Sequence, residues 1–144
     1  MYQAKSAFYS KKGVDRRGQR DAHVALCDTY TKILKINITD DTYQIVSMNE
    51  EEQSETKGFS DKISKWLHDF GTSGQVHPDD LGKYLQRTDV RFISSYFKSN
   101  RKTLLLSYRR KYGDEYKQSV MEIIPANDYT HYSQKLFLYV KNIE

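Results

Sequence analysis

The stretch Thr103–Tyr112, TLLLSYRRKY, decides the fold, because apolar or aromatic residues fall on its alternate positions. In a β-strand alternate side chains lie on the same face of the sheet. Gly113-Asp114 follows at once, and glycine supplies the positive φ that a tight hairpin turn needs. The next stretch, EYKQSVMEIIP, is again rich in strand formers and ends at Pro125. We therefore predict a β-hairpin whose first strand has one apolar face, formed by Leu104, Leu106, Tyr108 and Tyr112, with Ser107, Arg109 and Lys111 on the other.

Two further segments predict strands. After the turn-forming residues Ala126-Asn127-Asp128, the stretch Lys135–Ile143 contains LFLYV without a charge, which is typical of a strand buried on both faces. Upstream, residues 34–38 and 43–48 carry apolar residues in strand-like alternation on either side of Asp40-Asp41. This pattern predicts a second β-hairpin that turns at the two aspartates.

An acidic segment follows the upstream hairpin. It consists of Glu50-Glu51-Glu52 and Glu55. Like charges this close repel one another and stay solvated, so the segment predicts an exposed loop.

Three short amphipathic helices are predicted next. The first begins at Ser60-Asp61 and ends at Gly71 and Gly74, the second begins in His77-Pro78-Asp79-Asp80, and the third is capped by Thr88-Asp89. Their apolar faces are Ile63, Trp66, Leu67 and Phe70, then Leu81, Tyr84 and Leu85, then Val90, Ile93, Tyr96 and Phe97. The order of hairpin, helices and three-stranded meander predicts an α+β fold, in which short helices cover one face of a five-stranded antiparallel sheet.

The first 20 residues differ from the rest of the chain. They carry six basic residues and one aspartate, which gives this segment a net charge of +5. The whole chain has a formal net charge of +4, so residues 21–144 carry −1. Met1, Ala4 and Phe8 have helical spacing before Gly13, and Asp21–Tyr30 predicts another helix. We therefore divide the chain into an N-terminal helix and linker, 1–20, and one domain, 21–144.

Composition excludes several classes of protein. The single cysteine, Cys27, has no partner for an intramolecular disulfide, and no run of 18 apolar residues is present. We expect a soluble, cytoplasmic domain without direct membrane contact. A nucleic-acid interface should run through the folded body, whereas here the basic residues end at the N-terminal segment, so we expect no nucleic-acid partner.

The predicted domain resembles a PAS domain of a bacterial signalling protein over residues 29–144. The resemblance rests on the order of elements, on His77-Pro78-Asp79-Asp80, on Tyr108-Arg109-Arg110-Lys111-Tyr112-Gly113 and on the closing Val140–Glu144. In this chain Tyr112 stands where many relatives have aspartate, and Gln118 where they often have tryptophan. The ending Asn142-Ile143-Glu144 replaces the Asp-x-Thr that commonly couples a PAS sheet to its effector.

A second resemblance concerns the N-terminus. Met1–Lys5, Tyr9 and Gly13–Arg17 are similar to the closing helix and tail of a GGDEF domain, the catalytic module of diguanylate cyclases. The resemblance implies that Met1 is internal to a longer protein, that a GGDEF domain precedes it, and that adjacent signalling domains are partners. The alternative is a helix that packs on the PAS body or on a second copy of the chain, and we expect a homodimer through these helices.

No catalytic, metal or cofactor site is predicted. Tyr112–Tyr116, YGDEY, superficially resembles the GGDEF signature, but its glycine and aspartate are those of the hairpin turn. The histidines are scattered without an i,i+4 pair, which gives no support for zinc. His77 belongs to a helix start, and His68 is the only histidine on a helix that could face a pocket, as a haem ligand would. Cys27 precedes the first strand, whereas photoactive flavin-binding relatives carry their reactive cysteine on a central helix.

The resemblance implies a non-catalytic sensory or interaction module, linked through the GGDEF resemblance to cyclic-di-GMP signalling. A small ligand or a partner would alter the packing between helices and sheet, and no particular cofactor is implied. The side chains expected to line any pocket are Ile36, Trp66, Phe97, Leu106 and Tyr108. A closed core of the same residues is the equal alternative. The other two functions considered are an enzyme fragment of a diguanylate cyclase and a basic nucleic-acid-binding module.

Overall fold

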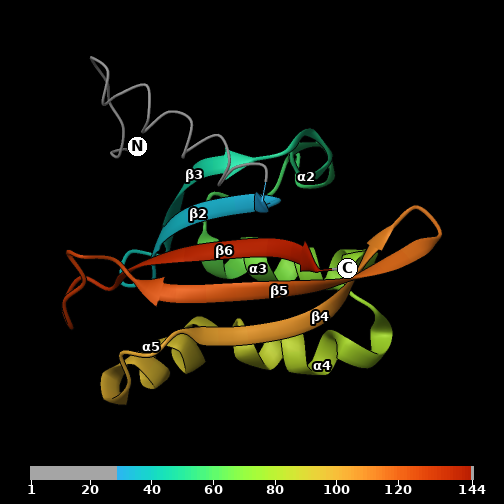
Figure 1. Cartoon of the computed structure of the whole chain (residues 1–144). Helices are drawn as coiled ribbons and strands as arrows, with labels where there is room; N and C mark the ends of the chain where they lie inside the picture. The colour runs from blue at the N-terminus through green and yellow to red at the C-terminus, as the bar shows by residue number, and fades with distance from the viewer. Residues whose placement is uncertain (1–28, 144) are drawn as a thin grey trace, which may run out of the picture.

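The computed structural model describes residues 29–143, which form a twisted sheet covered on one face by short helices (Figure 1). The predicted helix at the N-terminus and nearly all of the one predicted at Asp21–Tyr30 lie outside the described residues. Between residues 29 and 143, no helix is both long enough and apolar enough to span a membrane.

Five antiparallel strands make up the sheet in the order β3-β2-β6-β5-β4. Their bounds are β2 Lys32–Asn37, β3 Thr42–Met48, β4 Leu104–Tyr112, β5 Glu115–Pro125 and β6 Lys135–Ile143. The last strand pairs with both β2 and β5, so it joins the N-terminal hairpin to the C-terminal one. Tyr112 pairs with Glu115 across the two-residue turn, where Gly113 has a φ of 61°. The predicted hairpin is therefore confirmed.

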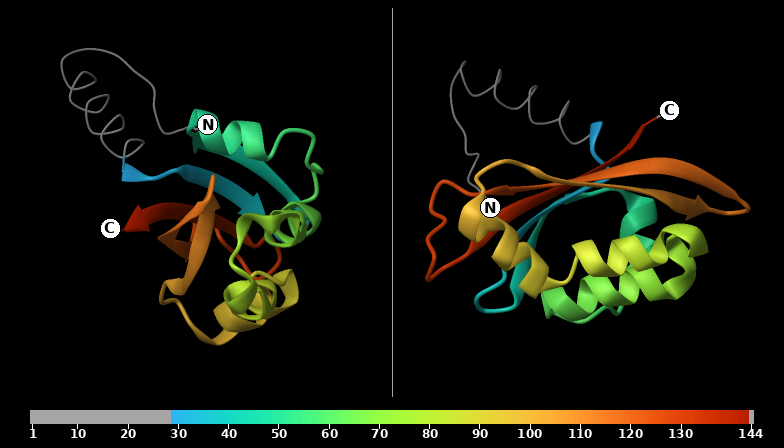
Figure 2. Two further views of the ribbon diagram at one scale, coloured as in Figure 1. Left: turned by 90° about the vertical axis from the view of Figure 1, so that its right-hand side faces the viewer. Right: turned by 90° about the horizontal axis from the view of Figure 1, so that it is seen from below.

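The helices lie on one side of the curved sheet (Figure 2). They are α2 Glu50–Glu55, α3 Ile63–Phe70, the π-helical turn η1 Gly71–Gln75, α4 Pro78–Arg87 and α5 Val90–Ser99. This arrangement confirms the predicted α+β class. Gly71 is required by close packing, because a Cβ there would come within 2.8 Å of the Tyr84 ring.

The prediction of an exposed acidic loop is wrong. Residues 50–55 form helix α2, and Glu52 is only 1% exposed. The Asn49 side chain caps the helix by accepting a hydrogen bond from the Glu52 amide, and the acidic first turn is favoured at the positive end of the helix dipole. A helix turns its side chains in different directions, so one glutamate enters the core while its neighbours stay solvated.

Helix α3 starts later than predicted and has a distant cap. Its N-cap position is Lys62, whose side chain makes no capping bond. Instead the Asp41 carboxylate, in the turn between β2 and β3, accepts hydrogen bonds from the Ser64 amide at 2.8 Å and the Ser64 hydroxyl at 2.7 Å. The Ser60 hydroxyl accepts only from the Lys62 amide. The upstream hairpin therefore fixes where this helix begins.

The starts of α4 and α5 agree with the prediction in position. His77 Nδ1 accepts a hydrogen bond from the Asp79 amide, and Pro78 occupies the first helical position. His77 is thus the cap of α4, and Asp79 and Asp80 lie in its first turn. Asp89 caps α5 by accepting from the Arg91 amide at 2.8 Å.

Strand β6 is buried on one face and half-buried on the other, which corrects the predicted two-sided burial. Leu136, Leu138 and Val140 lie under the helices with at most 2% exposure, whereas Phe137 and Tyr139 are only half-buried. The reason is that α3, α4 and α5 cover a single face of the sheet. The absence of charged residues in the central part of β6 therefore does not mean that both faces of the strand are covered.

Candidate functional site

The five residues predicted to line a pocket come together in one place. Ile36, Trp66, Phe97, Leu106 and Tyr108 belong to the same hydrophobic core, and each is at most 4% exposed. The Tyr108 ring makes an edge contact with Tyr84 of α4. Their use as a ligand pocket stays a prediction.

A group of buried charged residues lies against this core. Glu52 of α2 accepts a hydrogen bond at Oε1 from Lys32 Nζ of β2 and at Oε2 from Arg110 Nη2 of β4, both at 2.9 Å. All three side chains are at most 2% exposed. We call Lys32, Glu52 and Arg110 the charge cluster. It joins β2, α2 and the edge strand β4 in the interior of the domain.

Aromatic rings enclose the two cations. Lys32 Nζ lies 3.7 Å from the centroid of the Phe70 ring, and the Arg110 guanidinium carbon lies 5.0 Å from the same ring and 4.6 Å from Tyr112. At these distances a desolvated cation is attracted by the negative face of the ring. The rings thus replace part of the hydration that the cations lose.

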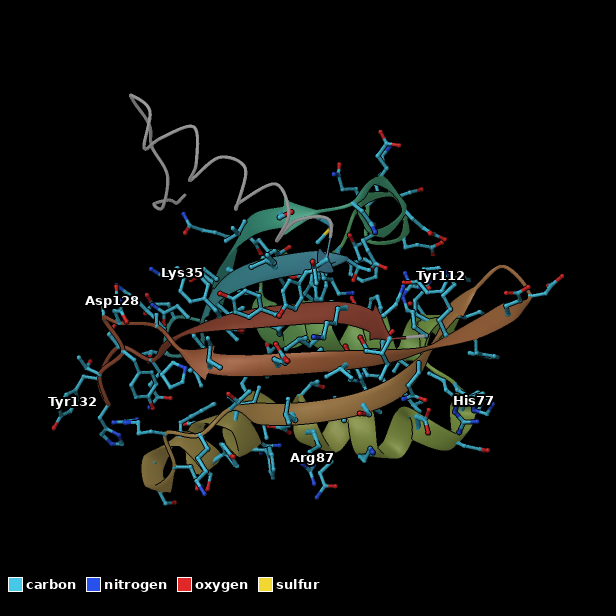
Figure 3. All side chains as sticks on the ribbon, in the orientation of Figure 1. Lys35, His77, Arg87, Tyr112, Asp128 and Tyr132 are labelled. Carbon is cyan, nitrogen blue, oxygen red and sulfur yellow. The ribbon has the colours of Figure 1, made fainter. Side chains whose placement is uncertain are left out.

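The cluster continues to the last strand through Tyr112, which Figure 3 marks beside the projecting β4–β5 hairpin. The Tyr112 hydroxyl donates a hydrogen bond to Glu52 Oε2 at 3.3 Å. The same hydroxyl accepts a hydrogen bond from Asn142 Nδ2 of β6 at 3.1 Å. Asn142 is held in turn by the Ser119 hydroxyl, which donates to Asn142 Oδ1 at 2.7 Å. A polar path therefore runs from α2 to β6.

Gln75 extends the network toward the surface. Its Oε1 accepts a short hydrogen bond from Arg110 Nη1, and its Nε2 donates to Glu55 at 2.6 Å. Gln75 is the last residue of the π-helical turn η1. The network therefore includes this turn together with two residues of α2, Glu52 and Glu55.

Burial and charge shift the protonation equilibria of the cluster. Burial lowers the pKa of Lys32 to about 8, although the neighbouring Glu52 carboxylate partly opposes this change. Burial alone would raise the pKa of Glu52, but Lys32 and Arg110 outweigh it and hold that pKa below its usual value. Burial also raises the pKa of Tyr112 to about 12. At neutral pH the cluster therefore carries two positive charges and one negative charge.

Two buried polar atoms, one in the cluster and one beside it, have no hydrogen-bond partner within residues 29–143. They are the Tyr108 hydroxyl and Arg110 Nε, both buried, from alternate residues of β4. A buried polar group without a hydrogen bond costs about 1–3 kcal/mol. Within residues 29–143 these two atoms are the buried side-chain nitrogen and oxygen atoms without a hydrogen bond, and both belong to the surroundings of the charge cluster.

The sequence contained a signal for this site. Arg110 occupies an even-numbered position of β4, in register with Leu104, Leu106 and Tyr108 on the inward face. Lys32 is likewise in register with Leu34 and Ile36 on β2. A charged residue at an inward strand position should have predicted a buried counter-ion. Glu52 was missed because its segment was predicted to be a solvated loop.

The histidines do not form a site. His68 is 63% exposed on α3 and lies near Asp69, so it does not face the core. His77 caps α4 at the molecular surface (Figure 3). His131 is exposed in the loop between β5 and β6, and His23 lies outside the described residues. Within the described chain, no three histidine, cysteine, aspartate or glutamate side chains lie close enough together to hold a metal ion.

Comparison with known proteins identifies the fold. No family model matches the chain, and no curated protein matches it in sequence. An RNA-binding light-oxygen-voltage receptor superposes with a TM-score of 0.50 at 6% identity, over 77% of this chain and 28% of that one. A sensory box histidine kinase/response regulator from Burkholderia thailandensis gives 0.48 at 9% identity, over 85% and 83% of the two chains. The N-terminal domain of a diguanylate cyclase with PAS/PAC sensor from Marinobacter aquaeolei gives 0.47 at 16%, over 77% and 93%.

At these identities the likeness concerns the fold alone. The five-stranded antiparallel sheet with helices on one face is a PAS-like α+β fold, as the resemblance in the sequence implied.

Proposed function

We propose that residues 21–144 form a non-catalytic PAS-type sensory or interaction module of a bacterial signal-transduction protein. The observation that supports this most is the polar path from α2 to β6. A module of this kind needs two packing states and a ligand or partner that binds them with different affinity. The charge cluster supplies an interior that is held together by a few hydrogen bonds and is not fully satisfied.

The proposed signal passes from the helices to the end of the sheet. A ligand or partner that displaces α2 must break or lengthen the Glu52 bonds to Lys32 and Arg110. Because Tyr112 contacts both Glu52 and Asn142, the same movement changes the support of β6 near its end. The resemblance to PAS domains implies that this end of β6, at Asn142 and Ile143, is where the sheet passes to its effector.

We further propose that the parent protein contains a GGDEF domain before Met1 and takes part in cyclic-di-GMP signalling. This rests on the sequence of residues 1–17 and its similarity to the closing helix and tail of such a domain. Sequencing the parent gene on both sides of the segment tests it. A translation start at Met1, or preceding residues without a Gly-Gly-Asp/Glu-Glu-Phe-like turn within one domain length, would refute it.

The test of the sensory role uses the full parent protein. Tyr112→Phe removes the hydroxyl between Glu52 and Asn142, and Tyr116→Phe, at an exposed position of the same hairpin, is the matched control. We expect the effector output of the first variant to differ from wild type at equal protein level, and that of the second to be unchanged. Equal outputs from all three proteins would contradict the proposed path.

A further inference from the structure

A surface groove lies at the end of the sheet away from the charge cluster. It runs between α5, the turn that joins β2 to β3, and the loop that joins β5 to β6, and it has a volume of about 520 Å³. Tyr132, which marks this end in Figure 3, is 87% exposed, and it lies far from Tyr112 and His77. We call this feature the α5 groove. Its size falls within the roughly 300–1,000 Å³ of typical ligand clefts.

One face of α5 forms a wall of the groove. Arg91, Ser94, Ser95 and Lys98 are spaced i, i+3, i+4 and i+7, which places them on the same side of the helix. The apolar residues Ile93 and Phe97 lie on the opposite, buried side. Half-buried Ile38 and Val90 contribute apolar surface to the groove. The groove therefore combines polar walls with an apolar patch.

The opposite wall is held by hydrogen bonds between two segments far apart in the sequence. The Gln134 amide donates to the Thr39 hydroxyl at 2.9 Å, and the Ile38 amide donates to the Gln134 carbonyl at 3.1 Å. Within the loop, Thr130 and Ser133 exchange backbone hydrogen bonds at 3.0 and 3.2 Å. These bonds pre-organise the groove, which lowers the entropy cost of binding.

The charge of the groove favours an acidic ligand. Its lining contains Arg91, Lys98 and His131 and no carboxylate. Asp89, just outside, accepts hydrogen bonds from Arg91 Nε at 3.3 Å and Nη2 at 3.1 Å; this exposed ion pair orients the guanidinium and offsets part of its charge. Lys98 has no ion-pair partner within residues 29–143. One cation is thus positioned and the other is available.

The spacing of the two cations along α5 favours an extended ligand with two negative groups. Arg91 and Lys98 are seven residues apart, and at 1.5 Å per residue this separates their backbones by about 10 Å along the helix. A ligand with two negative groups a comparable distance apart matches this spacing along the helix. A peptide in the polyproline II conformation rises about 3.1 Å per residue with three residues per turn, so carboxylates at i and i+3 lie on one side about 9 Å apart.

We propose that the α5 groove binds an acidic peptide segment of a partner protein in the polyproline II conformation, with two carboxylates at i and i+3. The carboxylates pair with Arg91 and Lys98, and an apolar residue between them contacts Ile38 and Val90. The exposed Tyr132 ring supplies the aromatic surface that such extended peptides commonly contact. This inference is independent of the sensory role proposed above, because it involves none of the charge cluster.

The experiment measures binding of a fluorescent peptide, Glu-Pro-Leu-Glu between glycines, to the full chain by anisotropy at low salt. Matched peptides are Gln-Pro-Leu-Gln, without charge, and Glu-Glu-Pro-Leu, with the same charge at the wrong spacing. Exposed ion pairs contribute about 0.2–1 kcal/mol each. The wrongly spaced peptide loses one pair and should bind up to about fivefold more weakly, and the uncharged peptide loses both and should bind up to about 30-fold more weakly. Amide resonances of Thr39, Ser94, Ser95 and Gln134 should shift on titration with the first peptide.

Two protein variants separate the groove from general surface charge. Lys98→Glu should weaken binding about fivefold or more, whereas Lys102→Glu, at an exposed lysine outside the groove, should leave it nearly unchanged. The proposal is overturned by no saturable binding, by equal binding of the three peptides, or by equal effects of the two substitutions. It is also overturned if inorganic phosphate produces the same resonance shifts with similar affinity, because the groove would then be a site for single small anions.

Discussion

Replacing Lys32 by methionine should change how stability depends on pH. The ammonium is fully buried between Glu52 and the Phe70 ring, and burial lowers its pKa from 10.5 to about 8. Methionine is an unbranched side chain that fills similar space without a charge. In the variant Glu52 keeps its bond to Arg110, so no buried charge loses its only partner.

The sign follows from proton binding in the folded and unfolded states. Between about pH 8 and 10.5 the unfolded chain keeps the Lys32 proton while the folded chain has lost it, so stability rises with pH over this window. Below pH 8 the folded state carries the whole cost of holding the buried cation. A shift of about 2.5 pKa units corresponds to about 3 kcal/mol. The free energy of unfolding of the wild type should therefore rise by that amount relative to Lys32→Met.

Urea unfolding at pH 7, 8, 9 and 10.5 measures this difference. Comparing the two proteins cancels the ionisation of tyrosines that both contain. The matched control is Lys35→Met on the same strand. The Lys35 side chain is 32% exposed, and its Nζ lies 3.8 Å from Asp128 Oδ2, so it is neither buried nor tightly paired. The wild type minus Lys32→Met difference should grow with pH and the control difference should stay small. If the difference in free energy of unfolding between the wild type and Lys32→Met did not change with pH, the claim that burial lowers the pKa of Lys32 would be refuted.

Three other outcomes are expected. Glu52→Gln leaves two buried cations without their carboxylate and should lower the free energy of unfolding by about 3–5 kcal/mol, measured by urea titration. The control Glu51→Gln, at an exposed position of the same helix, should lower it by less than about 0.5 kcal/mol. Gly71→Ala forces a Cβ against a buried tyrosine ring of α4 and should cost about 1–3 kcal/mol by the same assay, and an unchanged midpoint would contradict that packing. The chain should form no cyclic dinucleotide from nucleoside triphosphate and Mg²⁺, since the signature-like residues form a hairpin turn; product that disappears in Asp114→Ala plus Glu115→Ala would show the reverse.

Local patterns in the sequence predicted most of the fold. Alternation gave β4 and β5 with their turn, because each residue of a strand faces one side of the sheet. The start of α5 was predicted because Asp89 bonds an amide only two residues away. Chemistry of this kind depends on near neighbours and can be read in order along the chain.

The remaining features depend on distant partners. Glu52 is 58 residues from Arg110, and Asp41 caps a helix 23 residues away. The acidic residues are equivalent as neighbouring charges in the sequence, whereas their positions on α2 give only Glu52 access to Lys32 and Arg110. The inward register of Arg110 could have indicated a buried counter-ion, but nothing local showed which carboxylate it would be.

The dimer through the N-terminal helices stays a prediction, because residues 1–20 lie outside the described part of the chain. Sedimentation of the full chain and of a version without residues 1–20 tests it. A monomer at high protein concentration, or a dimer that survives the deletion, would contradict it.

The coupling between α2 and β6 is tested most directly by a double-mutant cycle of Glu52→Gln and Asn142→Ala. The measured quantity is the free energy of unfolding, first with Tyr112 present and then in Tyr112→Phe. Residues in one hydrogen-bond network show interaction energies of about 0.5–3 kcal/mol. We predict a value in that range with Tyr112, retained in Tyr116→Phe and close to zero in Tyr112→Phe. Additive effects in the presence of Tyr112 would contradict the account.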